Sequence, residues 1–232
     1  MVKAILFDFF GTIAVYGDMK EADEKSYKIM YDYVSSKDNS VAYDWFVNVW
    51  NENFNIPITL DEKTEDTIFL TKISKVFKAF NIAISSSEIA QIGQSCVNTW
   101  QSHISFPEDM HLTFRFLKSK YKLALVSNFD HPVHLRKLLV EKSLLNYFDS
   151  VVISGEIGIN KPDSKIFETA LKELNVLSSE AIFIGDNMID DISGAQCVGC
   201  KIILMDAQNL FKDFKGNKIA QISDLLSYNF CK

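Results

Sequence analysis

Runs of mostly apolar residues recur along the chain and are short enough to be strands. They occupy residues 2–7, 123–126, 151–153, 181–184 and 202–205. Within each run the apolar residues are adjacent and do not alternate with polar ones, which is typical of strands buried on both faces. The pattern therefore predicts a parallel sheet that is covered by helices.

The segments between the last four runs carry apolar residues at helical spacing. These segments cover residues 132–147, 163–174 and 189–198, with capping residues or a proline near their starts. Strand and helix thus alternate from about residue 105 onward, which is the pattern of an α/β fold. We predict a core domain with a Rossmann-like parallel sheet flanked by helices, built from residues 1–14 and 105–232.

The stretch between these two parts has a different pattern. Residues 15–104 contain no comparable strand run. Their apolar positions instead fit amphipathic helices at 21–36, 41–54, 65–80 and 86–100. The sequence therefore predicts an α-helical domain, residues 15–104, inserted after the first strand of the core.

The predicted helical domain is rich in aromatic residues. Five of them lie close together in the sequence: Tyr43, Trp45, Phe46, Trp50 and Phe54. Such a group could line a substrate cavity, but large aromatic side chains more often form the core of a small bundle. We favour the bundle core.

Composition and charge exclude several classes of protein. The chain has 232 residues, 47% of them hydrophobic, which is enough for a sizeable core. The net charge is −6 and the two arginines, Arg115 and Arg136, lie apart, so no basic stripe suits nucleic acid. No apolar stretch approaches the ~20 residues of a membrane span, and the first residues lead into a strand without a signal segment. We expect a cytoplasmic protein.

The four cysteines, Cys96, Cys197, Cys200 and Cys231, are too sparse for a disulfide framework, and we expect reduced thiols. Cys197 and Cys200 have the spacing of half a zinc site or of a redox pair. A structural zinc needs four ligands, however, and no second pair or matching histidines accompany them. We interpret the pair as small packing residues on a helix.

Polar residues follow the predicted strands, where a parallel sheet binds its ligands. They are Asp8, Ser127 with Asn128, and Gly185 with Asp186, followed by Asp190 and Asp191, while Lys161 lies in a loop before a helix. Taken singly, each could be a turn, cap or solvated residue. Together, carboxylates, a hydroxyl and a lysine at one sheet edge suit an anion and a hard cation such as Mg²⁺.

The order of these residues resembles four motifs of the haloacid dehalogenase-like (HAD) hydrolase superfamily. The matching segments are DFFGT at 8–12, VSN at 126–128, Lys161 in NKPD, and GDNMIDD at 185–191. The resemblance covers the whole chain and implies a HAD-like core. It also implies that the helical insertion is a cap domain of the family's first type.

The resemblance implies a phosphatase site. Asp8 would be the nucleophile that forms a covalent aspartyl intermediate. Ser127 and Lys161 would hold the phosphoryl oxygens, and Thr12 would steady the loop. Asn128 and Gly11 would also contact the substrate.

The resemblance also implies Mg²⁺ as the cofactor. Its ligands would be Asp8, Asp186 and either Asp191 or Asp190, together with the main-chain carbonyl of Phe10. The cation would offset repulsion between the carboxylates and the substrate anion.

Phe10 departs from the phosphatase pattern, which has a second aspartate there as general acid and base. Losing such a group costs on the order of 10²- to 10⁴-fold where the leaving group needs a proton. The family's 2-haloacid dehalogenases also lack that aspartate. They resemble one another, however, in a Ser-Ser-Asn type fourth motif and an arginine early in the cap, whereas this chain has Asp186 in its fourth motif and no arginine in residues 15–104.

The missing acid needs a replacement in a phosphatase. Asp130 is a candidate because it follows Ser127 in the same loop, and His131 and His134 are alternatives. A plainer interpretation, which we favour, is that Asp130 caps the helix that begins at Pro132. Tyr16 and Asp18, just after the first motif, could face the substrate.

We predict Mg²⁺-dependent hydrolysis of a small phosphorylated metabolite through an aspartyl-phosphate. The alternatives are a 2-haloacid dehalogenase and a phosphate-binding protein without catalysis. No pattern in the sequence identifies the substrate, and a homodimer stays open.

Overall fold

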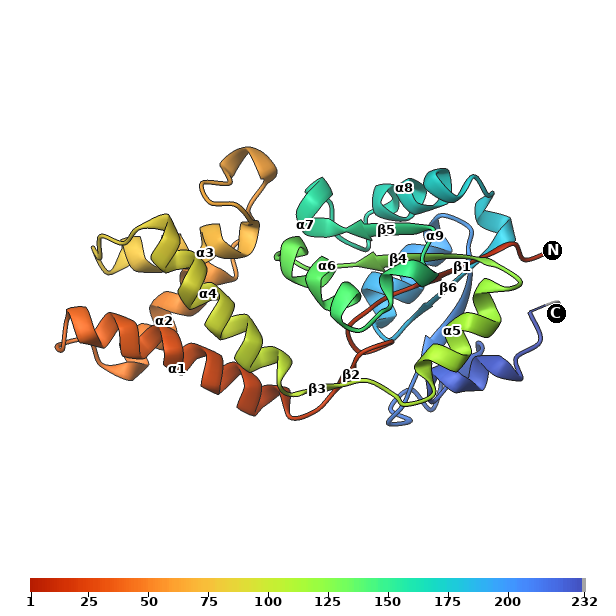
Figure 1. The fold of residues 1–232 in the computed structure, drawn as a ribbon, viewed down its shortest axis with the longest axis horizontal. Helices are drawn as coiled ribbons and strands as arrows, with labels where there is room; N and C mark the ends of the chain where they lie inside the picture. Colours follow the sequence, from red (N-terminus) through yellow and green to blue (C-terminus); the bar gives the residue numbers. More distant parts are fainter. Residues whose placement is uncertain (231–232) are drawn as a thin grey trace. The chain divides into compact units, whose positions relative to one another are not determined.

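The computed structural model describes residues 1–230, which form two compact units. The core unit comprises Met1–Val15 and the described part of Phe106–Lys232. The helical unit comprises Tyr16–Ser105. Two short strands, β2 (Val15–Tyr16) and β3 (Ile104–Ser105), pair where the chain passes from one unit to the other (Figure 1).

The core unit contains a parallel sheet with the strand order β5-β4-β1-β6-β7-β8. Figure 1 labels β5, β4, β1 and β6 of this sheet. The strands are β1 (Ala4–Phe7), β4 (Lys122–Ser127), β5 (Ser150–Ile153), β6 (Ala181–Gly185), β7 (Lys201–Met205) and β8 (Lys218–Ile219). The first five coincide with the apolar runs of the sequence, so the predicted α/β fold class is confirmed. The two residues of β8 are too few to show a pattern, and the sequence did not predict that strand.

Helices connect these strands and cover the sheet. They are α5 (Met110–Lys118), α6 (Pro132–Glu141), α7 (Ser154–Ile157), α8 (Ser164–Leu174), α9 (Gly194–Cys197), the π-helix η4 (Met188–Ser193) and the 3-10 helices η2 (Leu145–Tyr147), η3 (Ser178–Glu180) and η5 (Ile222–Leu226). The helix predicted at 132–147 ends earlier, at Glu141, and the one predicted at 189–198 begins with π geometry.

Both faces of the sheet are buried, as the apolar strands require. On one face, Leu6 of β1 packs in a cluster with Ile166 and Phe167 of α8. On the other, the Phe7 ring meets the ring of Phe114 of α5 edge to face, with the centroids 5.3 Å apart. Alternate residues of β1 thus pack against helices on opposite faces of the sheet. The polar residues follow the carboxyl end of the strand, beyond this apolar packing.

The helical unit is built from four helices. They are α1 (Met19–Lys37), α2 (Tyr43–Phe54), α3 (Ile68–Ala79) and α4 (Ser86–Gln101), with a 3-10 turn, η1 (Leu60–Glu62), between α2 and α3. Asp18 is the N-cap of α1 and accepts a hydrogen bond from the Glu21 N–H. Its carboxylate is therefore engaged by the helix, against the expectation that it faces the substrate.

The aromatic residues of α2 divide between core and surface. Phe46 and Trp50 are buried in the core of the helical unit, which confirms the bundle-core interpretation for these two residues. Tyr43 and Trp45 are 39% and 50% exposed, so that interpretation was wrong for them. Phe54 is partly buried and stacks on Trp50 at a centroid distance of 4.4 Å.

Three cysteines are free thiols: Cys96 and Cys200 are buried, whereas Cys197 is exposed. Cys200 is therefore a packing residue, as predicted, but it lies after α9 and not on a helix, whereas Cys197 is the last residue of α9 and does not pack. Cys231 lies outside the described residues. Across residues 1–230, no helix is both long and apolar enough to cross a membrane.

Candidate active site

The site is built at the carboxyl ends of three neighbouring strands, β4, β1 and β6. Asp8 follows β1 directly, and its N–H continues the sheet by donating to the Ile184 carbonyl of β6 at 2.9 Å. Ser127 is the last residue of β4, and Asp186 follows the last residue of β6. The strand order therefore brings these residues together at the edge where parallel sheets bind ligands.

Lys161 enters the site from the loop between α7 and α8. Its buried Nζ lies 2.5 Å from Asp8 Oδ1 and 2.6 Å from Asp191 Oδ1. Burial disfavours the charged amine, but the carboxylates of Asp8 and Asp191 outweigh that effect, and the pKa of Lys161 is raised. Lys161 is therefore a buried ammonium that bridges two acids, and it is not a solvated loop lysine.

The backbone of Lys161 is held by a single side chain. Asn128 Oδ1 accepts from the Lys161 N–H at 2.7 Å, and Asn128 Nδ2 donates to the Lys161 carbonyl at 3.0 Å. The sequence predicted Asn128 as a substrate contact. In the structure, its carboxamide instead binds the lysine loop through both of its polar atoms.

The first loop of the site is shaped around Asp186. Thr12 Oγ1 donates to Asp186 Oδ1 at 3.2 Å. Gly11 has a φ of +86°, and a Cβ at this position would overlap the Asp186 carboxylate. Gly11 is therefore required both for its backbone conformation and for the close approach of Asp186.

The π-helix η4 selects which of its two aspartates enters the site. Asn187 caps η4 by accepting from the N–H groups of Ile189 and Asp190 at 2.9 and 3.0 Å. Its own N–H donates to Asp191 Oδ2 at 3.0 Å. Asp191 is buried beside Lys161, whereas Asp190 is partly exposed, and only Asp191 joins the carboxylate cluster. The choice between them, left open by the sequence, falls on Asp191.

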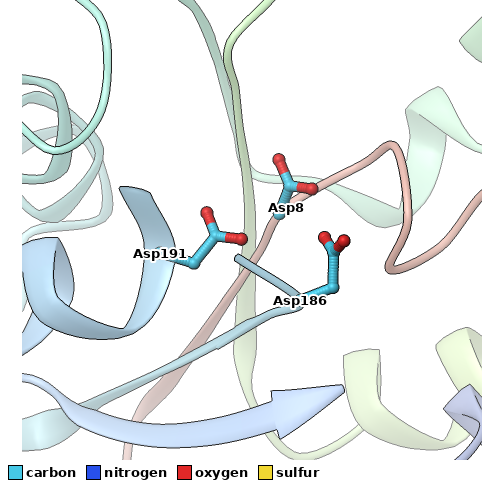
Figure 2. A group of neighbouring side chains, drawn as sticks. All are labelled: Asp8, Asp186 and Asp191. Atoms are coloured by element: carbon cyan, nitrogen blue, oxygen red, sulfur yellow. The ribbon is translucent and has the colours of Figure 1, made fainter. Parts of the chain in front are cut away.

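Three carboxylates converge in the site (Figure 2). Oxygen atoms of Asp8, Asp186 and Asp191 all lie within 4.8 Å of one another. Burial, with repulsion from Asp191, raises the pKa of Asp186 to about 6. Burial also raises the pKa of Asp8 to about 7, against the opposing effect of Lys161. Three acids facing one ammonium leave uncompensated negative charge, and their oxygen donors fit a hard divalent cation such as Mg²⁺.

The hydroxyl of Ser127 adds a polar group that points to a ligand. Ser127 is 1% exposed, and its Oγ has no hydrogen-bond partner in the described part of the chain. A buried hydroxyl without a partner costs stability. An anion at the edge of the sheet would accept its hydrogen bond.

Phe10 is packed away from water in an aromatic cluster. The ring is 8% exposed, and its centroid lies 4.8 Å from that of Phe9 and 4.9 Å from that of Phe129. The position after Asp8 and Phe9 is therefore part of the hydrophobic core and supplies no side-chain proton.

The loop after β4 holds the candidate proton donors. The N-cap of α6 is His131, one residue after the predicted Asp130, and the His131 side chain makes no capping hydrogen bond. His131 and His134 are buried with their rings 5.7 Å apart. Burial and the neighbouring His134 lower the pKa of His131 to about 4, and burial lowers that of His134. Neutral imidazoles are poor proton donors near pH 7, which weakens both histidines as candidates.

The comparison with protein families decides the classification. Residues 36–205 match the model of the haloacid dehalogenase-like hydrolases. The chain belongs to this family. The family that the four sequence motifs indicated is thus confirmed, and its fold agrees with the parallel sheet described above.

The relatives of this family member include phosphatases. A phosphoserine phosphatase from Thermus thermophilus is 36% identical over 103 residues, which are 44% of this chain and 41% of that protein. A glyceraldehyde 3-phosphate phosphatase from Pyrococcus abyssi is 33% identical over 97 residues, or 42% and 40% of the two chains. The alignments thus span about two fifths of the length of these relatives.

Solved structures of a phosphatase and of a dehalogenase match the fold of this chain equally well. The structure of a HAD phosphatase from Thermococcus onnurineus matches with a TM-score of 0.69 at 23% identity, covering 97% of both chains. That of a 2-haloacid dehalogenase from Pseudomonas syringae matches with the same TM-score at 21% identity, covering 98% of this chain and 99% of the other. The fold therefore does not discriminate between the reactions, and the side chains must.

Several contacts of the site were not predicted from the sequence. They are the clamp of Asn128 on Lys161, the cap formed by Asn187, and the contact between Thr12 and Asp186. Of these, only the Asn187 cap had a local signal, because asparagine before a helical turn is a common N-cap.

Proposed function

We propose that the protein hydrolyses a small phosphomonoester, with Mg²⁺ as cofactor and an aspartyl-phosphate at Asp8 as the intermediate. The observation that carries the proposal is the cluster of Asp8, Asp186 and Asp191 around the ammonium of Lys161. A dianionic ester needs positive charge near the attacking carboxylate. The Lys161 ammonium supplies one such charge, and the three carboxylates can bind a cation that supplies more.

In the first step, a carboxylate oxygen of Asp8 attacks phosphorus, and the bond from phosphorus to the leaving oxygen breaks. Lys161 donates to a phosphoryl oxygen and offsets the charge that accumulates on it. The Ser127 hydroxyl, which lacks a partner in the described residues, donates to another. Water then hydrolyses the acyl phosphate and regenerates the carboxylate.

The residues that would hold Mg²⁺ are Asp8, Asp186 and Asp191, with the main-chain carbonyl of Phe10. When bound, the cation would neutralise part of the repulsion between the nucleophile and the substrate dianion. Thr12 would keep the Asp186 carboxylate oriented through its hydrogen bond to Oδ1. Gly11 would allow the first loop to pass close to that carboxylate.

Asp130 is the residue we propose for the proton transfers that Phe10 cannot perform. It would protonate the leaving oxygen in the first step and take a proton from water in the second. Two observations support this assignment: the N-cap position of α6 is taken by His131 and not by Asp130, and burial favours the neutral form of the neighbouring histidines.

The helical unit would be the cap domain that selects the substrate. Its fold is supported by its own buried core, around Phe46 and Trp50. Tyr16, which is 41% exposed at its start, would contribute to the substrate surface. The substrate would be a small phosphorylated metabolite.

A parallel assay tests the proposal. A panel of phosphomonoesters and L-2-chloropropionate would be incubated with MgCl₂ or with a chelator, and released phosphate and chloride would be measured. We expect phosphate release that requires Mg²⁺ and is abolished in Asp8→Asn. Chloride release that continues in the presence of the chelator would instead identify a dehalogenase. Phe10 is the residue that favours this alternative.

The same protein can be tested for binding without catalysis. Beryllofluoride, which mimics a phosphoryl group on a carboxylate, should bind the wild type and not Asp8→Asn. Beryllofluoride binding with no turnover across the panel would identify a phosphate-binding protein and overturn the catalytic proposal.

A further inference from the structure

We propose that Asn128 is a positioning residue that couples the Ser127 loop to Lys161, and that it is not a substrate ligand. The inference deepens the proposed function and rests on it only where Lys161 is said to contact the phosphoryl group. Its structural basis is the pair of hydrogen bonds that joins the Asn128 carboxamide to one peptide unit on each side of the Lys161 Cα.

The Asn128 carboxamide forms hydrogen bonds with both polar groups of the Lys161 backbone. Oδ1 accepts from the Lys161 N–H at 2.7 Å, and Nδ2 donates to the Lys161 carbonyl at 3.0 Å. An asparagine side chain has one carbonyl oxygen and one amino group, and both are used here. Aspartate could reproduce only the acceptor, and alanine neither bond. A two-point contact of this kind fixes the position and the orientation of the lysine main chain.

The loop that carries Asn128 is itself anchored. The Phe129 N–H donates to Ser154 Oγ at 2.9 Å, and the Phe129 carbonyl accepts from the Gly155 N–H at 3.2 Å. On the other side, Ser127 belongs to β4 and pairs with Ile153 of β5 in the sheet. Asn128 therefore extends a rigid element toward Lys161, which lies 33 residues further along the chain.

The clamp relates two groups that would contact the same phosphoryl group. Ser127 is the neighbour of Asn128, and the Lys161 amine lies 2.5 Å from Asp8. If the Lys161 backbone shifts, the amine moves relative to Asp8 and to a bound phosphoryl group, while Ser127 stays in place. Displacements of about 1 Å at such positions can cost on the order of 10²-fold in rate. Asn128 would thus affect the rate without contacting the substrate.

The first arm of the test measures the clamp independently of activity. Amide hydrogen exchange of Lys161 should be about 10-fold or more faster in Asn128→Ala, because the acceptor of its N–H is lost. In Asn128→Asp the acceptor remains, so protection should be largely retained. An unchanged exchange rate in Asn128→Ala would overturn the proposal.

The second arm measures turnover and binding. We expect Asn128→Ala to lower kcat about 10- to 100-fold and to weaken the binding of inorganic phosphate less, and Asn128→Asp to recover part of the loss. A loss of phosphate affinity without faster exchange of the Lys161 amide would show a direct ligand and overturn the inference. If the wild type turned over no phosphomonoester, the proposed function would fail, while the exchange arm would still decide on the clamp.

Ser150→Ala is the matched control. Ser150 is buried on β5, and its Oγ donates to Glu173 at 2.7 Å, away from the residues assigned to the site. The variant therefore removes a buried hydrogen bond of similar kind. We expect it to lower the thermal stability, as Asn128→Ala would, but to leave kcat and the exchange of the Lys161 amide as in the wild type. Equal effects of the two variants on kcat would mean that Asn128 acts through general stability alone.

Discussion

At the residue scale, Phe10 determines how protons can move in this site. A phenyl ring neither gives nor accepts a proton, and this ring is packed between Phe9 and Phe129. In the proposed reaction, the nucleophile and the acid must therefore come from different segments of the chain. Asp8 follows β1, while Asp130 lies in the loop between β4 and α6.

The first prediction concerns this division of roles. Asp130→Asn should lower the turnover of an alkyl phosphate by about 10²- to 10⁴-fold, because the alkoxide needs a proton to leave. 4-Nitrophenyl phosphate should lose less, because 4-nitrophenolate is stable as an anion. Initial rates on the two substrates would be compared. Unchanged turnover of the alkyl phosphate would contradict the role of Asp130.

A second substitution tests whether an acid at position 10 can replace Asp130. Phe10→Asp, introduced into Asp130→Asn, should recover alkyl phosphate turnover by placing a carboxyl group two residues after Asp8. A buried carboxyl among aromatic rings also costs stability, so the melting temperature should fall. Failure to recover turnover, in a variant that still folds, would argue that no acid can act from position 10.

Gly11 is the other residue whose identity the structure explains. Gly11→Ala should cost about 1–2 kcal/mol for the left-handed conformation, and its Cβ would also displace the Asp186 carboxylate. Activity should therefore be lost together with stability. Gly199→Ala is the matched control, because its φ of +87° brings the same strain while the nearest atom is Ser178 Oγ at 3.2 Å. Loss of activity in the control would show that strain alone is sufficient.

At the element scale, the ends of the helices decide which side chains enter the site. The π-helix η4 places Asp191 inside and leaves Asp190 partly exposed. At α6, His131 takes the N-cap position and is buried against His134, so a polar group at the start of this helix is kept neutral. Both features depend on one turn of helix.

The burial of His131 predicts how stability depends on pH. The pKa of His131 is about 4 in the folded protein, against an ordinary value of 6.5. Between pH 4 and pH 6.5 the unfolded state therefore binds more protons than the folded state. The stability from the buried neutral imidazole is therefore complete above about pH 6.5 and is lost as the pH falls toward 4. The loss should be on the order of 2–3 kcal/mol. Urea unfolding at pH 7 and pH 5 should show a smaller difference for His131→Gln than for the wild type; an equal difference would exclude His131 as the cause.

At the scale of the whole molecule, the site is a concentration of buried negative charge that the rest of the core unit supports. The raised pKa values of Asp8 and Asp186 mean that their carboxylates are less favourable in the folded protein than in the unfolded chain. The sheet and its two covering layers compensate for this cost, as is common where function requires unfavourable electrostatics.

Removing one of these charges should therefore stabilise the protein without metal. Asp186→Asn should raise the unfolding free energy at pH 7 by on the order of 1–2 kcal/mol, because it removes a partly buried charge that repels Asp191. Mg²⁺ should raise the melting temperature of the wild type by binding the folded state, and should do so less in the variant. Equal shifts with Mg²⁺ would mean that Asp186 does not bind the cation.

The five strands that were predicted are short apolar runs buried on both faces, so the information for each lies within its own few residues. The same holds for Asp8, Ser127 and Asp186, because the residue that ends a buried strand is visible in the sequence. By contrast, β8 and the start of α6 have weak local patterns, and the N-cap of α6 is His131, one residue after the predicted Asp130.

The sequence by itself thus determined the strands, the family and the chemical groups that lie near the sheet edge. Only the tertiary structure decided how these groups are paired: Asp191 in place of Asp190, Lys161 bridging two acids, and Asn128 bound to the lysine loop. The reason is physical. Asp8 and Lys161 are separated by 153 residues and Asn128 and Lys161 by 33, so their contacts exist only once the strands have their order in the sheet.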